Sequence, residues 1–131
     1  MNSKIMTVGI TSKEDYTKRT LAIAKGEYKP GKDEPRVWFE SLKSMSQVLS
    51  NDNQALLKLI IEHQPQSLTE LEKLSHRKKS NLSRTLKTLE KYGIVDLPKK
   101  EGRLIPKVLA TDFKIEFGLS SGKTDISRKA G

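Results

Sequence analysis

Hydrophobic residues recur at every third or fourth position through the middle of the chain, which is the spacing of an amphipathic helix. This spacing predicts one helix that begins at Ser41 and ends near Asn51, and a second that ends before Pro65. His63 falls on the apolar face of the second helix, so we expect a core-edge histidine rather than a metal ligand. The apolar faces comprise Leu42, Met45, Val48 and Leu49 in the first helix and Leu56, Leu59, Ile60 and His63 in the second.

Two further helices follow. Ser67 precedes Glu70 by three residues, a capping-box signature in which each side chain accepts from the other's backbone amide. It predicts a short helix whose inward residues are Leu68, Leu71 and Leu74. A longer helix is expected from about Lys79 to Tyr92, ended by Gly93 as a left-handed cap. Its inward residues are Leu82, Leu86 and Leu89.

Alternation of apolar and polar residues predicts strands at both ends of the chain, over Lys4–Thr11 and Asp112–Leu119. The second of these alternates Phe113, Ile115 and Phe117 on one face. Between them we expect a brief extended piece at Arg36–Phe39 and a hairpin formed by Ile94–Leu97 and Arg103–Leu109 around the turn Lys99–Gly102. Pro106 cannot donate to a ladder, so the second hairpin strand should be an edge strand.

The remaining segments complete the expected organisation. Ser12 can cap a helix that runs to about Lys25, and residues 28–35 read as a polar, turn-rich linker. The fold class is therefore mainly α with a small β component. We expect an N-terminal strand–helix extension with its linker over residues 1–40, a main domain of helices and hairpin over 41–110, a C-terminal strand over 111–119 and a disordered tail over 120–131.

Positive charge is concentrated on the helix expected from about Lys79 to Tyr92 and on the hairpin. From His76 to Lys107 the chain holds ten Lys or Arg against three acids, whereas the other 99 residues hold fifteen against thirteen. A concentration of this kind is the electrostatic footprint of a polyanion-binding surface. A merely solvated face is the blander interpretation, and it would mix its signs more evenly.

The composition argues against several other classes of function. The chain has no cysteine, which excludes disulfides and thiolate chemistry and agrees with a reducing, cytoplasmic location. Its longest apolar run, Leu56–Ile61, is interrupted by Lys58 and too short to span a bilayer. No nucleophile–base–acid set, metal cluster or glycine-rich phosphate loop emerges. We therefore expect no enzyme, no catalytic residue, no metal site and no cofactor.

The order from Asp52 to Leu109 is helix, short helix, tight turn, longer helix and hairpin, which is typical of a winged helix-turn-helix. In that motif the second helix of the pair enters the major groove and the wing touches the flanking backbone. The buried leucines of the longer helix point donors and acceptors suited to base edges outward. The candidate DNA-binding residues are Arg77, Lys78, Lys79, Ser80, Asn81, Arg84, Lys87 and Thr88 at and on the helix, and Lys99, Lys100 and Arg103 in the wing.

These segments resemble a known family. Residues 68–74 (LTELEKL) and 79–95 (KSNLSRTLKTLEKYGIV) are similar to the helix-turn-helix of MarR-like winged-helix regulators. The whole chain further resembles a prokaryotic group of small transcriptional regulators, some of which look like the antitoxin of TumE/TumA-type toxin–antitoxin pairs. Two residues depart from the pattern. His76 stands where glycine is common, and Lys78 stands where a serine or threonine cap is usual, so the start of the recognition helix is open by a residue or two.

The leading interpretation is a homodimeric, sequence-specific regulator that binds double-stranded DNA, with the two terminal strands pairing within or between protomers. The alternative is an antitoxin, a protein-interaction module that neutralises a cognate toxin with or without operator binding. A third is a winged helix used for RNA or for non-specific binding, which an exposed aromatic platform would favour; none is visible in the sequence.

Overall fold

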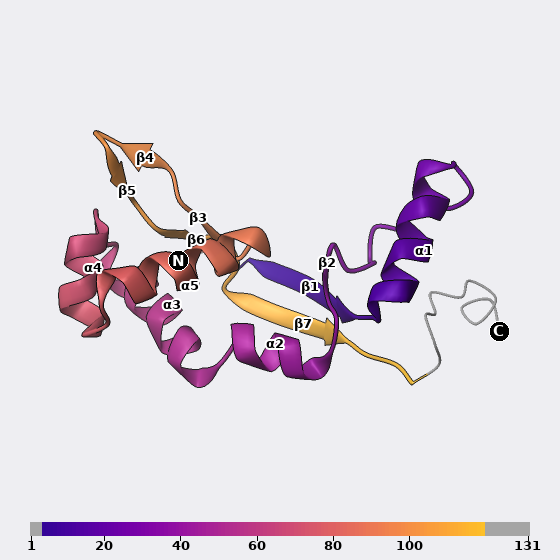
Figure 1. Ribbon diagram of the computed structural model, residues 1–131, viewed down its shortest axis with the longest axis horizontal. Coiled ribbons are helices and arrows are strands. Elements are labelled where there is room, and N and C mark those ends of the chain that lie inside the picture. The colour runs from indigo at the N-terminus through magenta and orange to yellow at the C-terminus, as the bar shows by residue number, and fades with distance from the viewer. Residues whose placement is uncertain (1–3, 120–131) are drawn as a thin grey trace. The chain divides into compact units, whose positions relative to one another are not determined.

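The computed structural model describes residues 4–119, and the expected disordered tail over 120–131 lies outside the described residues (Figure 1). The described part has mixed α and β structure, which confirms the expected α+β class. Its helices are α1 (Lys13–Ala24), α2 (Leu42–Val48), α3 (Asn51–His63), α4 (Leu68–Ser75) and α5 (Lys79–Lys91). Its strands are β1 (Ile5–Ile10), β2 (Val37–Phe39), β3 (Val95–Asp96), β4 (Lys99–Lys100), β5 (Arg103–Leu104), β6 (Lys107–Val108) and β7 (Asp112–Glu116).

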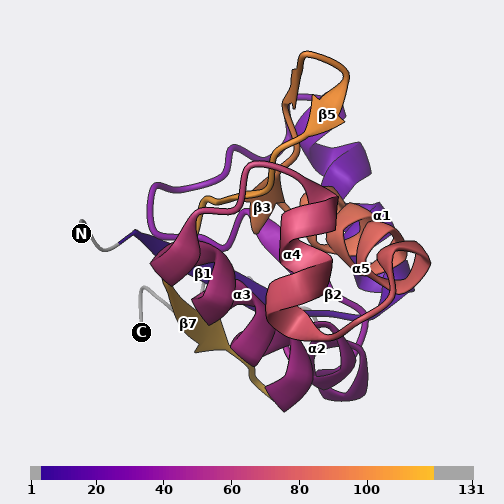
Figure 2. The same ribbon diagram turned by 90° about the vertical axis from the view of Figure 1, so that its left-hand side faces the viewer.

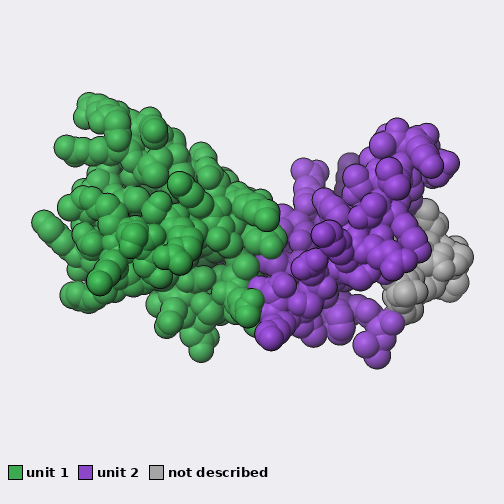
Figure 3. Space-filling model, in the orientation of Figure 1, with its two compact units in different colours: residues 1–4, 46–112 green, residues 5–45, 113–131 purple. Residues whose placement is uncertain are grey.

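The chain divides into two compact units (Figure 3). The first contains residue 4 and residues 46–112, and so holds α3 to α5 and the strands β3 to β6. The second contains residues 5–45 and the described residues from 113 onward. No helix in residues 4–119 is both long and apolar enough to cross a membrane.

The core of the first unit is built on the leucine spacing of α4 and α5. Leu71, Leu82, Leu86 and Leu89 are fully buried, and Ile94 joins them immediately after α5. From α3 the core takes Leu56, Leu57 and Ile60, of which Leu57 was not expected. His63 is exposed, so its expected place at the core edge was wrong: it ends α3, just before the left-handed cap Gln64 turns the chain.

Each helix of the first unit begins or ends on a local signal. Ser50 and Ser67 accept from the amides of Asn53 and Glu70, 3.2 and 3.1 Å away. The Glu70 carboxylate accepts from the backbone amide of Gln66 rather than from that of Ser67. The second hydrogen bond of the expected capping box is therefore shifted by one residue. At the end of α5, Gly93 has a φ of 75°. The amides of Gly93 and Ile94 donate to the carbonyls of Glu90 and Leu89, which is a Schellman motif.

The expected hairpin forms with two differences. The long strand Arg103–Leu109 is split into β5 and β6 because Pro106 has no amide to donate to a continuous ladder. As a result β6 pairs with β3 and β5 pairs with β4, each antiparallel. Lys99 and Lys100 lie in β4 rather than in the turn. The turn itself has two residues, Glu101 and Gly102, both with positive φ, as two-residue hairpins favour.

The second unit contains a three-stranded sheet in the order β2-β1-β7. β1 and β2 are parallel, with Val8 opposite Val37 and Ile10 opposite Phe39, and Figure 1 shows the β7 arrow pointing the same way as that of β1. The two terminal strands therefore pair within one protomer. Gly9 is required where it stands because a Cβ there would collide with the Trp38 ring.

Candidate nucleic-acid interface

The outer face of α5 carries the densest group of predicted site residues. Leu82, Leu86 and Leu89 are fully buried on one side of this helix. The helical repeat of 3.6 residues therefore turns Ser80, Arg84 and Lys87 to the opposite side. All three are exposed, as are Asn81 and Thr88. Lys91 shares this face, seven positions after Arg84, and is also exposed. Lys91 was absent from the predicted site, although the same leucine register could have identified it.

The turn between α4 and α5 has three residues, and the structure resolves both departures from the usual pattern. His76 adopts the left-handed conformation with φ of 61° and ψ of 25°, in the place where glycine is common. Lys78 is the N-cap residue of α5 and makes no capping bond with its side chain. The Glu72 carboxylate of α4 takes that role and accepts from the Lys79 amide at 3.0 Å. α5 therefore begins at Lys79.

Arg77 differs from the other candidates because its guanidinium is hydrogen-bonded to three side chains of the protein. Its Nε donates to Asn81 Oδ1 at 2.7 Å, its Nη2 to Thr85 Oγ1 at 2.8 Å, and its Nη1 to Asn53 Oδ1 at 3.3 Å. The residue is half-buried, whereas Lys78 and Lys79 beside it are exposed. Arg77 thus connects the first turn of α3 to two turns of α5.

The β4–β5 hairpin places three more basic residues in solvent. Lys99, Lys100 and Arg103 are exposed, and Lys100 pairs with Arg103 directly beside the two-residue turn. Figure 2 shows β5 standing out above the helices of the first unit. We call the exposed residues of α5, its first turn and this hairpin the basic surface. It comprises Lys78, Lys79, Ser80, Asn81, Arg84, Lys87, Thr88, Lys91, Lys99, Lys100 and Arg103.

Within residues 4–119, the cations of the basic surface form no salt bridge with an acidic side chain. Both salt bridges recorded among residues 4–119 lie in the second unit, where Lys18 pairs with Glu14 and Arg19 with Glu34. Protein charges that remain unpaired are free to pair with phosphates and release the counterions condensed on nucleic acid. The surface is therefore suited to a polyanion.

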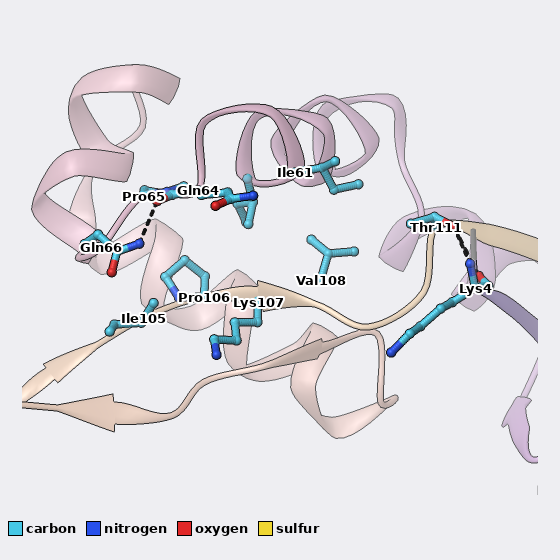
Figure 4. Close-up of a pocket in the computed structure, with 11 residues that line it drawn as sticks. Lys4, Ile61, Gln64, Pro65, Gln66, Ile105, Pro106, Lys107, Val108 and Thr111 are labelled. Atoms are coloured by element: carbon cyan, nitrogen blue, oxygen red, sulfur yellow. Dashed lines mark hydrogen bonds between the residues drawn. The ribbon is translucent and has the colours of Figure 1, made fainter. Parts of the chain in front are cut away.

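A separate cavity of about 360 Å³ lies in the first unit between α3 and the β6 strand (Figure 4). Its walls are mainly apolar, with Ile60, Pro65 and Pro106 buried, and its two charged residues are Lys4 and Lys107. The volume is at the lower end of the range of small-molecule sites. The lining has no carboxylate and no histidine, and Thr111 supplies its one hydroxyl group.

The second unit holds a buried polar cluster that sequence reasoning missed. Glu34, in the expected polar linker, is only 7% exposed and accepts hydrogen bonds from Tyr28 and from the Gly31 amide. Arg19 pairs with Glu34 at 3.9 Å and lies over the Trp38 ring, 5.1 Å from its centroid. Burial, and then the hydrogen bond to Glu34, raise the pKa of Tyr28 to about 12. The contact between Arg19 and Glu34 thus holds the linker against α1.

No group of three or more His, Asp or Glu side chains that could hold a metal ion occurs within the described part of the chain.

Comparison with known families covers the first unit. The family model HVO_A0114 matches residues 48–115, which include α3 to β6 and therefore the whole basic surface. Because this match spans half of the chain, the protein belongs to the HVO_A0114 family. No curated protein and no solved structure matches the chain.

Proposed function

We propose that this protein is a transcriptional regulator that binds specific sequences of double-stranded DNA through a winged helix-turn-helix. In this proposal α4 and α5 form the helix-turn-helix, α5 is the recognition helix, and the β4–β5 hairpin is the wing. The observation that carries the proposal is the outer face of α5. Behind fully buried leucines it exposes Ser80, Asn81, Arg84, Lys87 and Thr88, whose groups suit the major-groove edges of base pairs.

The wing and the start of α5 supply the second kind of contact. Lys99, Lys100 and Arg103 lie where a wing meets the phosphate backbone, and Lys78 and Lys79 lie at the N-terminal end of the recognition helix. Cations gain nothing from the helix dipole at that end. Their placement there is explained by a bound polyanion. Phosphate contacts of this sort fix the register of the protein, while the helix reads the sequence.

The proposal includes a homodimer, formed through the second unit. Pairing of β1 with β7 leaves β7 at the edge of the sheet, and an edge strand presents unpaired amides and carbonyls. Ile115 and Phe117 remain 46% and 52% exposed there, and Ile5 of β1 is 72% exposed. A second copy would cover this surface. Two recognition helices would then read half-sites about one helical turn apart.

The same exposed strand supports a second candidate function, an antitoxin that binds a cognate toxin. An edge strand with apolar side chains can pair with a strand of another protein as readily as with a strand of a second copy of this chain. Sedimentation at micromolar concentration distinguishes the homodimer from the antitoxin. A dimer without any partner supports self-association. A monomer that co-purifies with the product of a neighbouring reading frame, and rescues growth from it, supports the antitoxin.

The experiment for DNA recognition is a titration against the duplex upstream of the protein's own gene and against an unrelated duplex, at two salt concentrations. We expect a preference of about a thousandfold or more for the upstream duplex, within the usual specific range. Equal, steeply salt-dependent binding to both duplexes would reduce the basic surface to a non-specific polyanion site.

A further inference from the structure

We propose that Arg77 fixes the amide of Asn81 as a hydrogen-bond donor toward DNA, so that the base pair facing Asn81 is read as guanine rather than adenine. The inference rests on the proposed DNA-binding function and names the base chemistry of the same surface. Arg77 acts here as a positioning residue, and Asn81 is the residue that contacts the base.

The orientation of Asn81 follows from the chemistry of its partner. An arginine side chain has five N–H donors and no acceptor. The Asn81 atom that lies 2.7 Å from Arg77 Nε must therefore be the oxygen Oδ1. The nitrogen Nδ2, with two N–H groups, is left for other partners. Asn81 itself is exposed, so this amine is accessible to a ligand.

Arg77 is held on its other side too. Its Nη2 donates to Thr85 on the next turn of α5, and its Nη1 donates to Asn53 of α3. Asn53 is oriented in turn, because its Nδ2 donates to the Val48 carbonyl at 3.0 Å. The guanidinium is thus supported at three points on two helices, and it holds the Asn81 oxygen toward the protein.

Reading adenine requires the opposite arrangement. An asparagine pairs with adenine by accepting from N6 and donating to N7, so both ends of its amide must face the base edge. Because Oδ1 already accepts from Arg77, the amine is the end of the Asn81 amide that has no partner within the described residues. Guanine presents two acceptors in the major groove, N7 and O6. Adenine presents one acceptor, N7, beside the N6 amine, which cannot pair with the Asn81 amine. A donor without an acceptor therefore favours guanine.

The neighbours of Asn81 on α5 have the same polarity. Arg84 and Lys87 carry donors only and are exposed. The Thr88 hydroxyl donates to the Arg84 carbonyl at 3.2 Å, so toward a ligand its oxygen can only accept. The middle of the recognition helix thus presents a continuous set of donors, which matches a groove edge of consecutive acceptors.

The test is selection of bound duplexes from a random-sequence library by the full chain, followed by sequencing. It compares the wild type with Asn81→Ala, Arg77→Lys and, as a matched phosphate-contact control, Lys100→Ala. We expect the wild type to enrich guanine at the position that Asn81→Ala relaxes, with the preference there falling roughly tenfold. Arg77→Lys should shift that position toward adenine, because lysine lacks the fork that holds Oδ1. Lys100→Ala should leave base preference unchanged.

The outcomes distinguish a failure of the Asn81 inference from a failure of the proposed DNA-binding function. Failure of the wild type to enrich any sequence overturns the proposed function, and this inference with it. Enrichment of adenine at the Asn81-dependent position overturns the inference alone, as does an Asn81→Ala variant that relaxes no position. Asn81 is exposed, so that variant tests the inference even if thermal unfolding shows that Arg77→Lys does not fold.

Discussion

The carboxylate of Glu72, in α4, accepts a hydrogen bond of 3.0 Å from the backbone amide of Lys79, the first residue of α5. This contact supplies the cap that Lys78 cannot provide, and it joins the two helices across the three-residue turn. The negative charge of Glu72 also lies at the positive end of α5, where the helix dipole favours it. The start of the proposed recognition helix thus depends on a residue of the preceding helix.

Replacement of Glu72 should therefore destabilise the first unit. We expect Glu72→Ala to lower the free energy of unfolding by about 1 kcal/mol, the typical value of a lost N-cap. Urea denaturation measures the change. Glu62→Ala on α3 is the matched control, since Glu62 is exposed and its side chain makes no hydrogen bond or salt bridge within residues 4–119. It should change stability by less than about 0.5 kcal/mol. Equal effects of the two variants would show that Glu72 is not the cap.

The leucine face of α5 makes a larger contribution. Leu86 is fully buried, so Leu86→Ala removes packed methyl groups and leaves a cavity, at a cost of roughly 2–5 kcal/mol. The midpoint of urea denaturation should fall accordingly. Lys58→Ala, at an exposed position of α3, is the control and should leave the midpoint nearly unchanged. A loss below 1 kcal/mol for Leu86→Ala would argue against the assigned core.

Arg84 should contribute to specificity. We expect Arg84→Ala to weaken binding to the upstream duplex by about 1–3 kcal/mol while sparing binding to an unrelated duplex. The reason is that an arginine on the groove-facing side of the helix contacts base edges, which only the correct sequence presents. Parallel titrations against both duplexes give the ratio. An unchanged ratio would mean that α5 is not the recognition helix.

Lys100 should behave differently, as a contact to phosphate. Lys100→Ala should weaken binding to both duplexes about equally and reduce the slope of log affinity against log salt by about one. Titration at several salt concentrations measures the slope. Lys58→Ala again serves as the control, because it removes one positive charge outside the basic surface. A slope that stays at the wild-type value would show that Lys100 of the hairpin does not contact phosphate.

The Tyr28–Glu34 contact predicts a pH dependence in the second unit. The pKa of Tyr28 is raised to about 12 by burial and by its hydrogen bond to Glu34, whereas an unfolded tyrosine titrates near 10. The folded state therefore holds this proton more tightly. The resulting stability is fully present below about pH 10 and is lost as the pH rises toward about 12. The stability difference between wild type and Tyr28→Phe should shrink over this range; a constant difference would contradict the assignment.

Much of the fold could be predicted because its signals are local. The buried leucines of α5 repeat every three or four residues, and Ser67 and Gly93 mark the ends of helices by side-chain or backbone chemistry within a few residues. The exposed residues of α5 follow from the same register. Lys91 could have been included on that basis. The basic character of this segment is likewise a property of composition.

Other features depend on residues that are distant in sequence, and no local pattern encodes them. Glu34 reads as part of a polar linker, yet Arg19 and Tyr28 enclose it once the linker folds back on α1. Arg77 reads as one more exposed cation, yet Asn53, 24 residues earlier, draws its guanidinium inward. Asn53 and Arg77 meet only because α3 packs beside the later helices of the first unit.

The sequence by itself determined where the helices lie, which face of α5 is buried, and that the exposed face is basic, because helical periodicity and side-chain charge are properties of neighbouring residues. The tertiary structure decided that β1 and β7 share one sheet, that Glu72 caps α5, and that the Asn81 oxygen accepts from Arg77. Each of these depends on atoms brought together by chain folding, and the energy of such contacts is fixed by distance in space rather than by separation along the chain.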